Sequence, residues 1–131
     1  MGLWETCRVA LIVTVGFTLA RLRRYEVTGT SMAPTLLPGD RLLIWRTRSV
    51  RPGQLVLARD PRQPTRVIVK RVTAEAGPPR RVLLTLRGDH AAGSTDSRTF
   101  GAVPRRLVIG RVAYRYAPSE RRDVWKTLAE R

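Results

Sequence analysis

Two residues, Ser31 and Lys70, have side chains that together could carry out nucleophilic chemistry. Ser31 lies on a turn of small residues, and Pro34 follows it three positions later. A serine hydroxyl is a poor nucleophile at neutral pH and needs a base to take its proton. Lys70 stands in an apolar run over residues 67–72, and a neutral amine can act as that base. We therefore interpret Ser31 as a nucleophile and Lys70 as its general base.

Lys70 is unusual because the chain contains 23 arginines and only two lysines. Arginine keeps its proton under all protein conditions, whereas a desolvated lysine can lose its own. At a pKa near 10.4 only roughly one lysine in 2,500 is neutral at pH 7, so a lysine base must be desolvated. On a strand Lys70 would point the same way as Ile68 and Val72, and Arg71 would point to the opposite face. The pattern predicts a buried Lys70 with a strongly lowered pKa.

The chain has few of the residues that other kinds of catalytic site require. Cys7 is the only cysteine and His90 the only histidine, which excludes an internal disulfide, a cysteine cluster and a multi-histidine metal site. A Ser-His-Asp triad would have to use His90, which lies among Asp, Ala and Gly and is typical of a solvated loop. We expect no metal and no cofactor.

The composition indicates one domain with a basic surface. The chain has 131 residues and a formal net charge of +15, so it is attracted to acidic lipid headgroups and phosphate backbones. Nucleic-acid binding would need a recognisable reading element, and the sequence shows none. A basic β module that binds nucleic acid is the non-enzyme alternative, and no nucleic-acid partner is expected.

Short strands separated by Pro and Gly turns predict an all-β, mainly antiparallel domain over residues 25–118. Pro38-Gly39 suits a type II turn, and Pro52-Gly53 is expected to form a second turn. Segments 61–64 and 90–98 are expected to be loops. The expected strands cover residues 25–28, 41–46, 54–58, 66–73, 81–87 and 107–116.

The two ends of the chain are expected to be helical. Ser119 can cap a C-terminal amphipathic helix over residues 119–131, with Val124, Trp125 and Leu128 on one face. Residues 1–24 contain an apolar run and are interpreted as a hydrophobic anchor helix. The alternatives for this segment are a removed or surface-bound peptide and a buried core element.

The orientation of such an anchor is ambiguous. Arg21, Arg23 and Arg24 follow the apolar run and Arg8 precedes it, so the positive-inside rule would place the domain inside. That placement conflicts with the orientation implied by the family resemblance described next.

Four sequence blocks, in order, resemble the type I signal (leader) peptidases, the serine-lysine membrane proteases that include the mitochondrial inner-membrane peptidases. A similar Gly110-Arg111-Val112 follows them. The blocks are Gly29-Thr30-Ser31-Met32-Ala33-Pro34-Thr35-Leu36, Gly39-Asp40, Lys70-Arg71-Val72, and Gly88-Asp89 with Ser94-Thr95-Asp96-Ser97-Arg98 and Gly101. The resemblance implies a signal-peptidase/LexA-like catalytic β fold without the large extra β domain of some bacterial members.

The resemblance implies roles for individual residues. Ser31 would attack the scissile carbonyl, and Lys70 would accept its proton and pass it to the leaving amine. Ser94 matches the family serine that orients the lysine. Asp96 and Arg98 match a structural pair that braces the site, and Asp89 is expected to lie near them as a further supporting residue.

The oxyanion and substrate sites are also implied by the resemblance. Gly29 stands where one family branch has a side-chain hydroxyl, so the oxyanion donor would be the Ser31 backbone N–H, with Gly29 and Thr30 beside it and Thr28 as a further contributor. The substrate would bind as an added strand with small residues at −1 and −3. The residues expected to line its pockets are Val27, Met32, Leu36 and Val69.

The implied function is removal of leader peptides from exported proteins by a single-pass membrane enzyme, with its catalytic domain on the extracytoplasmic or intermembrane-space side. Its partners would be precursor proteins, membrane lipid and an unidentified partner subunit. The alternative is a dedicated maturation protease of the same family, of the kind that removes the pro-segment of nickel superoxide dismutase.

Overall fold

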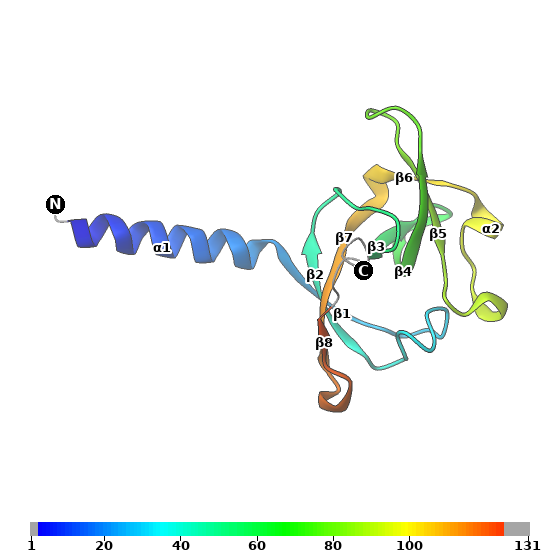
Figure 1. Cartoon of the computed structure of the whole chain (residues 1–131), viewed down its shortest axis with the longest axis horizontal. Coiled ribbons are helices and arrows are strands. Elements are labelled where there is room, and N and C mark those ends of the chain that lie inside the picture. Colours follow the sequence, from blue (N-terminus) through cyan, green and yellow to red (C-terminus); the bar gives the residue numbers. More distant parts are fainter. Residues whose placement is uncertain (1–2, 125–131) are drawn as a thin grey trace.

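The fold is built around one antiparallel sheet. In the computed structural model, which describes residues 3–124, the strands follow the order β1-β2-β7-β3-β4-β5-β6, with β8 paired to β7 (Figure 1). Every pairing between these strands is antiparallel. The strands are β1 Leu22–Glu26, β2 Arg41–Arg46, β3 Leu55–Asp60, β4 Gln63–Ala76, β5 Leu83–Arg87, β6 Val103–Pro104, β7 Val108–Ala117 and β8 Asp123–Val124. The all-β fold class expected from the sequence is confirmed.

Two Pro-Gly turns lead into β2 and β3. Gly39 and Gly53 have φ values of 91° and 94°, which glycine adopts without the steric cost of a Cβ. The Asp40 N–H donates to the Leu37 carbonyl at 3.0 Å, which closes the first turn. The type II turn expected at Pro38-Gly39 and the turn expected at Pro52-Gly53 are therefore confirmed.

Several element bounds differ from the sequence-based expectation. Strand β1 covers Leu22–Glu26 rather than residues 25–28. It therefore begins inside the segment 1–24 that was expected to be the anchor helix, and α1 ends at Ala20. Strand β4 begins at Gln63, inside the segment expected to be a loop, because the Asp60 carboxylate accepts hydrogen bonds from Arg62 and tightens the preceding turn. The loop expected over 90–98 contains the 3-10 turn η1 (Ala91–Gly93) and runs into the short helix α2 (Ser97–Phe100).

The C-terminal helix expected over 119–131 does not begin at Ser119. Ser119–Arg121 instead forms the 3-10 turn η3, and β8 follows it and pairs with β7. The Arg121 guanidinium donates to the buried Asp40 carboxylate, which holds this turn against the domain. The remainder of that helix lies outside the described residues and stays a prediction.

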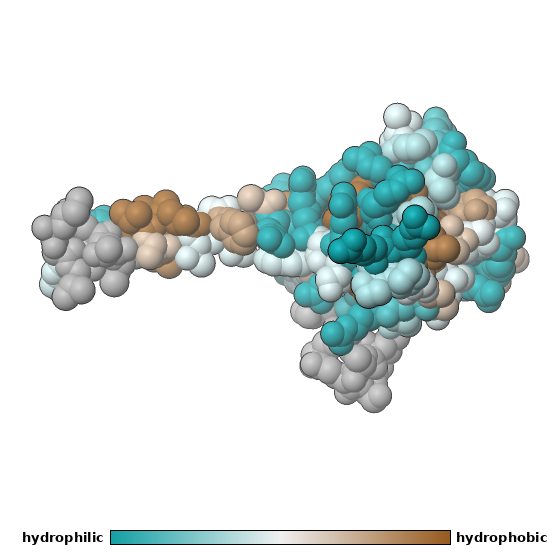
Figure 2. Space-filling model, turned by 90° about the horizontal axis from the view of Figure 1, so that it is seen from above, coloured by the Kyte–Doolittle hydropathy of each residue, from teal (hydrophilic) through white to brown (hydrophobic). Residues whose placement is uncertain are grey.

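Helix α1 (Leu3–Ala20) extends away from the sheet, as Figure 1 shows. Its aliphatic and aromatic side chains have no domain to pack against, and they form the hydrophobic band along the projecting arm in Figure 2. Within residues 3–124, no helix meets the length and hydropathy needed to cross a membrane. The exposed large hydrophobic side chains of α1 are Trp4, Val9, Leu11, Ile12, Val13, Val15, Phe17 and Leu19.

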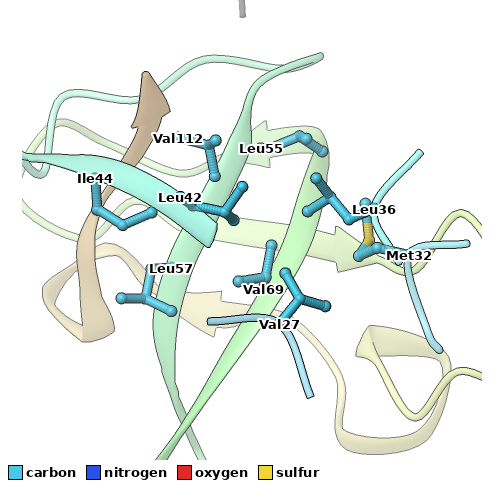
Figure 3. Packing of buried hydrophobic residues seen from close by; sticks show 9 residues of the cluster. All are labelled: Val27, Met32, Leu36, Leu42, Ile44, Leu55, Leu57, Val69 and Val112. Atoms are coloured by element: carbon cyan, nitrogen blue, oxygen red, sulfur yellow. The ribbon is translucent and has the colours of Figure 1, made fainter. Parts of the chain in front are cut away.

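The core has two clusters, one on each side of the central strand β3. Leu55 and Leu57 belong to the first cluster, and Val56 and Ala58 belong to the second. Because side chains alternate along a strand, both faces of β3 must be covered. Figure 3 shows the first cluster, in which β2, β3, β4 and β7 meet the segment that carries Ser31.

Candidate active site

Lys70 lies in the middle of β4 and is buried, with a relative exposure of 3%. Its Nζ donates a hydrogen bond to Ser94 Oγ at 3.0 Å. Burial lowers the pKa of Lys70, the nearby Asp96 carboxylate opposes this change, and the positive charge of Arg66 adds to it. The net result is a lowered pKa, because removal from water disfavours the charged amine.

Asp96 anchors the hydroxyl that Lys70 contacts. The Asp96 carboxylate is fully buried and accepts hydrogen bonds from Ser94 Oγ at 3.0 Å, from the Gly88 N–H at 2.9 Å and from Arg98 Nη2 at 2.6 Å. The hydrogen bonds from Arg98 hold the pKa of Asp96 well below its usual range. An ionised Asp96 can only accept, so Ser94 directs its proton to Asp96 and its lone pairs to Lys70.

Ser31 lies on the turn between β1 and β2. This turn is closed by the Ala33 N–H, which donates to the Thr30 carbonyl at 3.0 Å. The Ser31 carbonyl accepts from the His90 N–H at 2.9 Å. Backbone contacts therefore join the Ser31 turn to the loop that also carries Ser94.

Gly88 lies between Ser31 and Ser94. A Cβ at this position would collide with the Ser94 side chain and with the Ser31 carbonyl oxygen. Only a glycine lets the backbone come this close. Loop 88–96 thus brings the nucleophile turn and the lysine's partner together.

Ser31 and Lys70 line the same cavity, whose volume is about 310 Å³. Gly29 and Thr30 line this cavity as well, as expected for residues near an oxyanion site. The structure brings together these four residues, which are as many as 41 positions apart in the sequence.

Three of the four residues expected to form substrate pockets line the cavity: Val27, Met32 and Val69. Leu36 is fully buried and does not line the cavity. It packs beside Met32 in the first core cluster (Figure 3), and the Leu36 N–H donates to the Met32 carbonyl at 2.9 Å across the intervening turn. The site residue predicted at Leu36 is therefore a core residue behind the cavity.

Asp89 forms a second brace that differs from the sequence-based expectation. Its carboxylate does not join Asp96 and Arg98 but accepts from Arg71 Nε at 2.9 Å and from Thr35 Oγ1 at 2.5 Å. Burial alone would raise the pKa of Asp89, but the hydrogen bonds from Arg71 and Thr35 outweigh it and lower the pKa. Arg71 points away from Lys70 on β4, so this brace holds the opposite face of the same strand.

The sequence alone assigned no role to four residues that contact the supporting residue Asp89 or line the cavity. Thr35 and Arg71 belonged to the matching blocks, but their partner Asp89 is 54 and 18 positions away. Arg62 and Arg66 line the cavity, although Arg62 lies in a segment expected to be a loop. A basic pair shortly before the lysine was the only sequence signal for them.

Comparison with known proteins identifies the family. A family model described as "Signal peptidase, peptidase S26" matches residues 2–82. The mitochondrial ATP-independent inner membrane protease subunit 1a of Arabidopsis thaliana is 37% identical over 118 residues, covering 72% of this chain and 70% of that protein. The mitochondrial inner membrane protease subunit 2 of Danio rerio is 33% identical over 135 residues, covering 86% of this chain and 73% of that protein. These matches support the resemblance seen in the sequence blocks, and the chain is a peptidase that belongs to the signal peptidase family, peptidase S26.

Proposed function

We propose that the chain is a serine endopeptidase in which Ser31 is the nucleophile and Lys70 is the general base. The observation that carries this proposal is the buried Lys70 amine, which is held by Ser94 in the cavity that Ser31 also lines. A buried amine with a lowered pKa can be neutral when the substrate arrives. Arg71 is adjacent in sequence, but its charge is fixed and paired with Asp89.

The reaction proceeds in two halves. Lys70 Nζ takes the proton from Ser31 Oγ as that oxygen bonds to the scissile carbonyl carbon. The resulting ammonium gives the proton to the leaving nitrogen as the C–N bond breaks, leaving an ester on Ser31. A water molecule then attacks the ester with Lys70 again acting as base, and the N-terminal product leaves as a carboxylic acid. The Ser31 N–H, beside Gly29 and Thr30, stabilises the oxyanion in both halves.

The substrate in this proposal is the leader segment of a precursor protein. An extended peptide would lie beside β4, where Val27, Met32 and Val69 leave room for small side chains at −1 and −3. The relatives are named as mitochondrial inner membrane proteases and as subunits. The proposal therefore includes attachment to a membrane through the exposed apolar side chains of α1, a catalytic domain on the extracytoplasmic or intermembrane-space side, and a partner subunit.

The test uses the full chain in detergent with a leader-bearing precursor. Ser31→Ala, Lys70→Ala and Lys70→Arg should each lose at least about 10³-fold in cleavage rate, the last because arginine cannot give up its proton. Ser49→Ala and Lys126→Ala are the matched controls and should cleave normally. Circular dichroism would check that each variant folds.

Comparable cleavage by any folded variant of Ser31 or Lys70 would refute the mechanism. Proteomics of precursors that accumulate after depletion of the protein tests the substrate class. Many leader-bearing precursors would support general leader removal, whereas a single one would support a dedicated maturation protease.

A further inference from the structure

A second hollow lies elsewhere on the domain, and its floor is apolar. Its volume is about 490 Å³, and it shares no lining residue with the Ser31–Lys70 cavity. The floor is formed by Pro79 and Val82 from the β4–β5 turn, Leu83 of β5 and Pro104 of β6. Leu83 is 43% exposed, which is high for a large aliphatic side chain in a sheet. We call this hollow the β5–β6 groove.

Five arginines surround the β5–β6 groove: Arg48, Arg80, Arg81, Arg105 and Arg106. They come from three separate segments of the chain, and no acidic residue lines the groove. Within residues 3–124, Arg48, Arg80, Arg81 and Arg106 form no ion pair. The groove thus concentrates positive charge around an apolar surface.

Among residues 3–124, Arg105 is the groove arginine that has an acidic partner. Its Nη2 pairs with Glu75 at 2.9 Å, while its Nε is buried and has no acceptor in the described part of the chain. A buried donor without an acceptor is unfavourable. Within residues 3–124, the Arg105 guanidinium at the groove therefore has one buried N–H without an acceptor.

The groove lies at the end of the domain where the β4–β5 turn projects in Figure 1. Figure 2 looks onto that end and shows strongly hydrophilic side chains with hydrophobic patches between them. The backbone there is well defined: Gly77 has a φ of 98°, and the Arg81 N–H donates to the Pro78 carbonyl at 2.8 Å. Arg80 and Arg81 thus lie on a hydrogen-bonded turn between the paired strands β4 and β5.

We propose that the β5–β6 groove binds an anionic phospholipid, with the phosphate among the arginines and the apolar part of the lipid on the floor. Guanidinium groups match phosphate oxygens in a bidentate geometry. A free phosphate would leave the apolar floor unused, whereas a lipid uses both surfaces. The exposed apolar side chains of α1 favour the same occupant, because a helix of this kind brings the domain close to lipid.

This proposal goes beyond peptide cleavage, and neither Ser31 nor Lys70 enters it. A basic surface alone would attract lipid without regard to position, since the whole chain carries a net charge of +15. The groove predicts instead that a few arginines contribute much more than others of equal charge. Each groove arginine should change lipid affinity by roughly fivefold.

The experiment measures lipid retention by the full chain in uncharged detergent micelles, using native mass spectrometry. The probes are phosphatidylglycerol, phosphatidylcholine, inorganic phosphate and a short DNA duplex. Arg80→Gln combined with Arg106→Gln should weaken phosphatidylglycerol binding roughly 30-fold. The matched control, Arg59→Gln combined with Arg87→Gln, removes the same charge from exposed positions outside the groove and should change binding less than about twofold.

Leu83→Gln distinguishes the contribution of the lipid's apolar part from that of its phosphate group. It should weaken phosphatidylglycerol binding and leave the weak binding of inorganic phosphate unchanged. Equal losses in the groove and control double variants would overturn the proposal, because charge alone would then explain binding. Equal retention of phosphatidylcholine, or groove-dependent binding of the duplex without binding of the anionic lipid, would overturn it as well.

Discussion

At Lys70 two neighbouring charges act in opposite directions on one proton. Burial lowers its pKa, Asp96 raises it again, and Arg66 lowers it further. Asp96 also reaches Lys70 through the Ser94 hydroxyl. A base held in this way keeps its orientation while it gains and loses a proton, which is what the proposed reaction requires.

Arg66→Gln tests this balance through the pH dependence of cleavage. Under the proposed mechanism kcat/KM rises with pH as Lys70 loses its proton. Because the positive charge of Arg66 disfavours the ammonium form, its removal should raise the pKa of Lys70 and move the rising limb to higher pH. The measurement is kcat/KM across pH, with Arg59→Gln as the control.

A change in substrate affinity would alter the height of that profile without moving its midpoint, which separates electrostatic tuning from binding at the cavity. A limb that stays in place, or that moves to lower pH, would show that Arg66 does not influence the base.

At the scale of elements, β4 and loop 88–96 hold the site between them. Lys70 and Arg71 point to opposite faces of β4, and the loop reaches both, through Ser94 to Lys70 and through Asp89 to Arg71. Gly88 stands where the loop touches the Ser31 turn. Small movements of this loop should therefore be transmitted directly to the catalytic residues.

Gly88→Ala should reduce both stability and activity. Its Cβ would overlap with Ser94 and with the Ser31 carbonyl, and such overpacking costs about 1–3 kcal/mol of the free energy of unfolding. Denaturant unfolding and precursor cleavage would measure the two effects. The control is Gly16→Ala, where a Cβ meets no atom within 4 Å. Normal cleavage and stability in Gly88→Ala would show that the loop is not tightly packed on the Ser31 turn.

At the scale of the whole molecule, Asp40 joins the start of β2 to the C-terminal part of the described chain. Its carboxylate accepts from Arg115 Nη1 at 3.2 Å and from Arg121 at 3.2 Å, and Arg115 also donates to the Thr35 carbonyl at 2.8 Å. Burial alone would raise the pKa of Asp40, but the Leu37 N–H and the Arg121 guanidinium outweigh it and lower the pKa. This cluster ties the Ser31 segment to η3.

Asp40→Asn should destabilise the fold by about 3–5 kcal/mol at pH 7, because it removes the buried negative charge to which Arg115 and Arg121 both donate. A carboxyl group with a lowered pKa stabilises the fold above its unfolded pKa, near 3.8, and loses that contribution as the pH falls through its folded value. Wild-type stability should therefore fall below about pH 4, and that fall should be smaller in Asp40→Asn. Urea unfolding at several pH values measures both effects.

Glu26→Gln is the matched control, since Glu26 makes an exposed pair with Arg41 and such pairs contribute about 0–1 kcal/mol. Equal stability of the two variants at pH 7 would mean that the Asp40 cluster contributes nothing beyond an ordinary surface pair.

Much of this architecture was readable from local residue types. Strand β2 was expected over residues 41–46 and occupies them, and both Pro-Gly turns formed where expected, because turn chemistry and alternation act over a few residues. The burial of Lys70 followed from its aliphatic neighbours along β4 in the same way. The order of the four sequence blocks was enough to indicate the family.

The fold was needed for every contact between distant segments. The pairing of Asp89 with Arg71 and Thr35, the cluster around Asp40 and the β5–β6 groove join residues whose sequence neighbourhoods give no sign of one another. The prediction that a helix begins at Ser119 was wrong for the same reason. A capping serine is a local signal, whereas hydrogen bonds from Arg121 to Asp40, 81 positions away, fix that turn. Local propensity is weak beside such contacts, so the partners of these residues follow from how the sheet closes and not from their order in the chain.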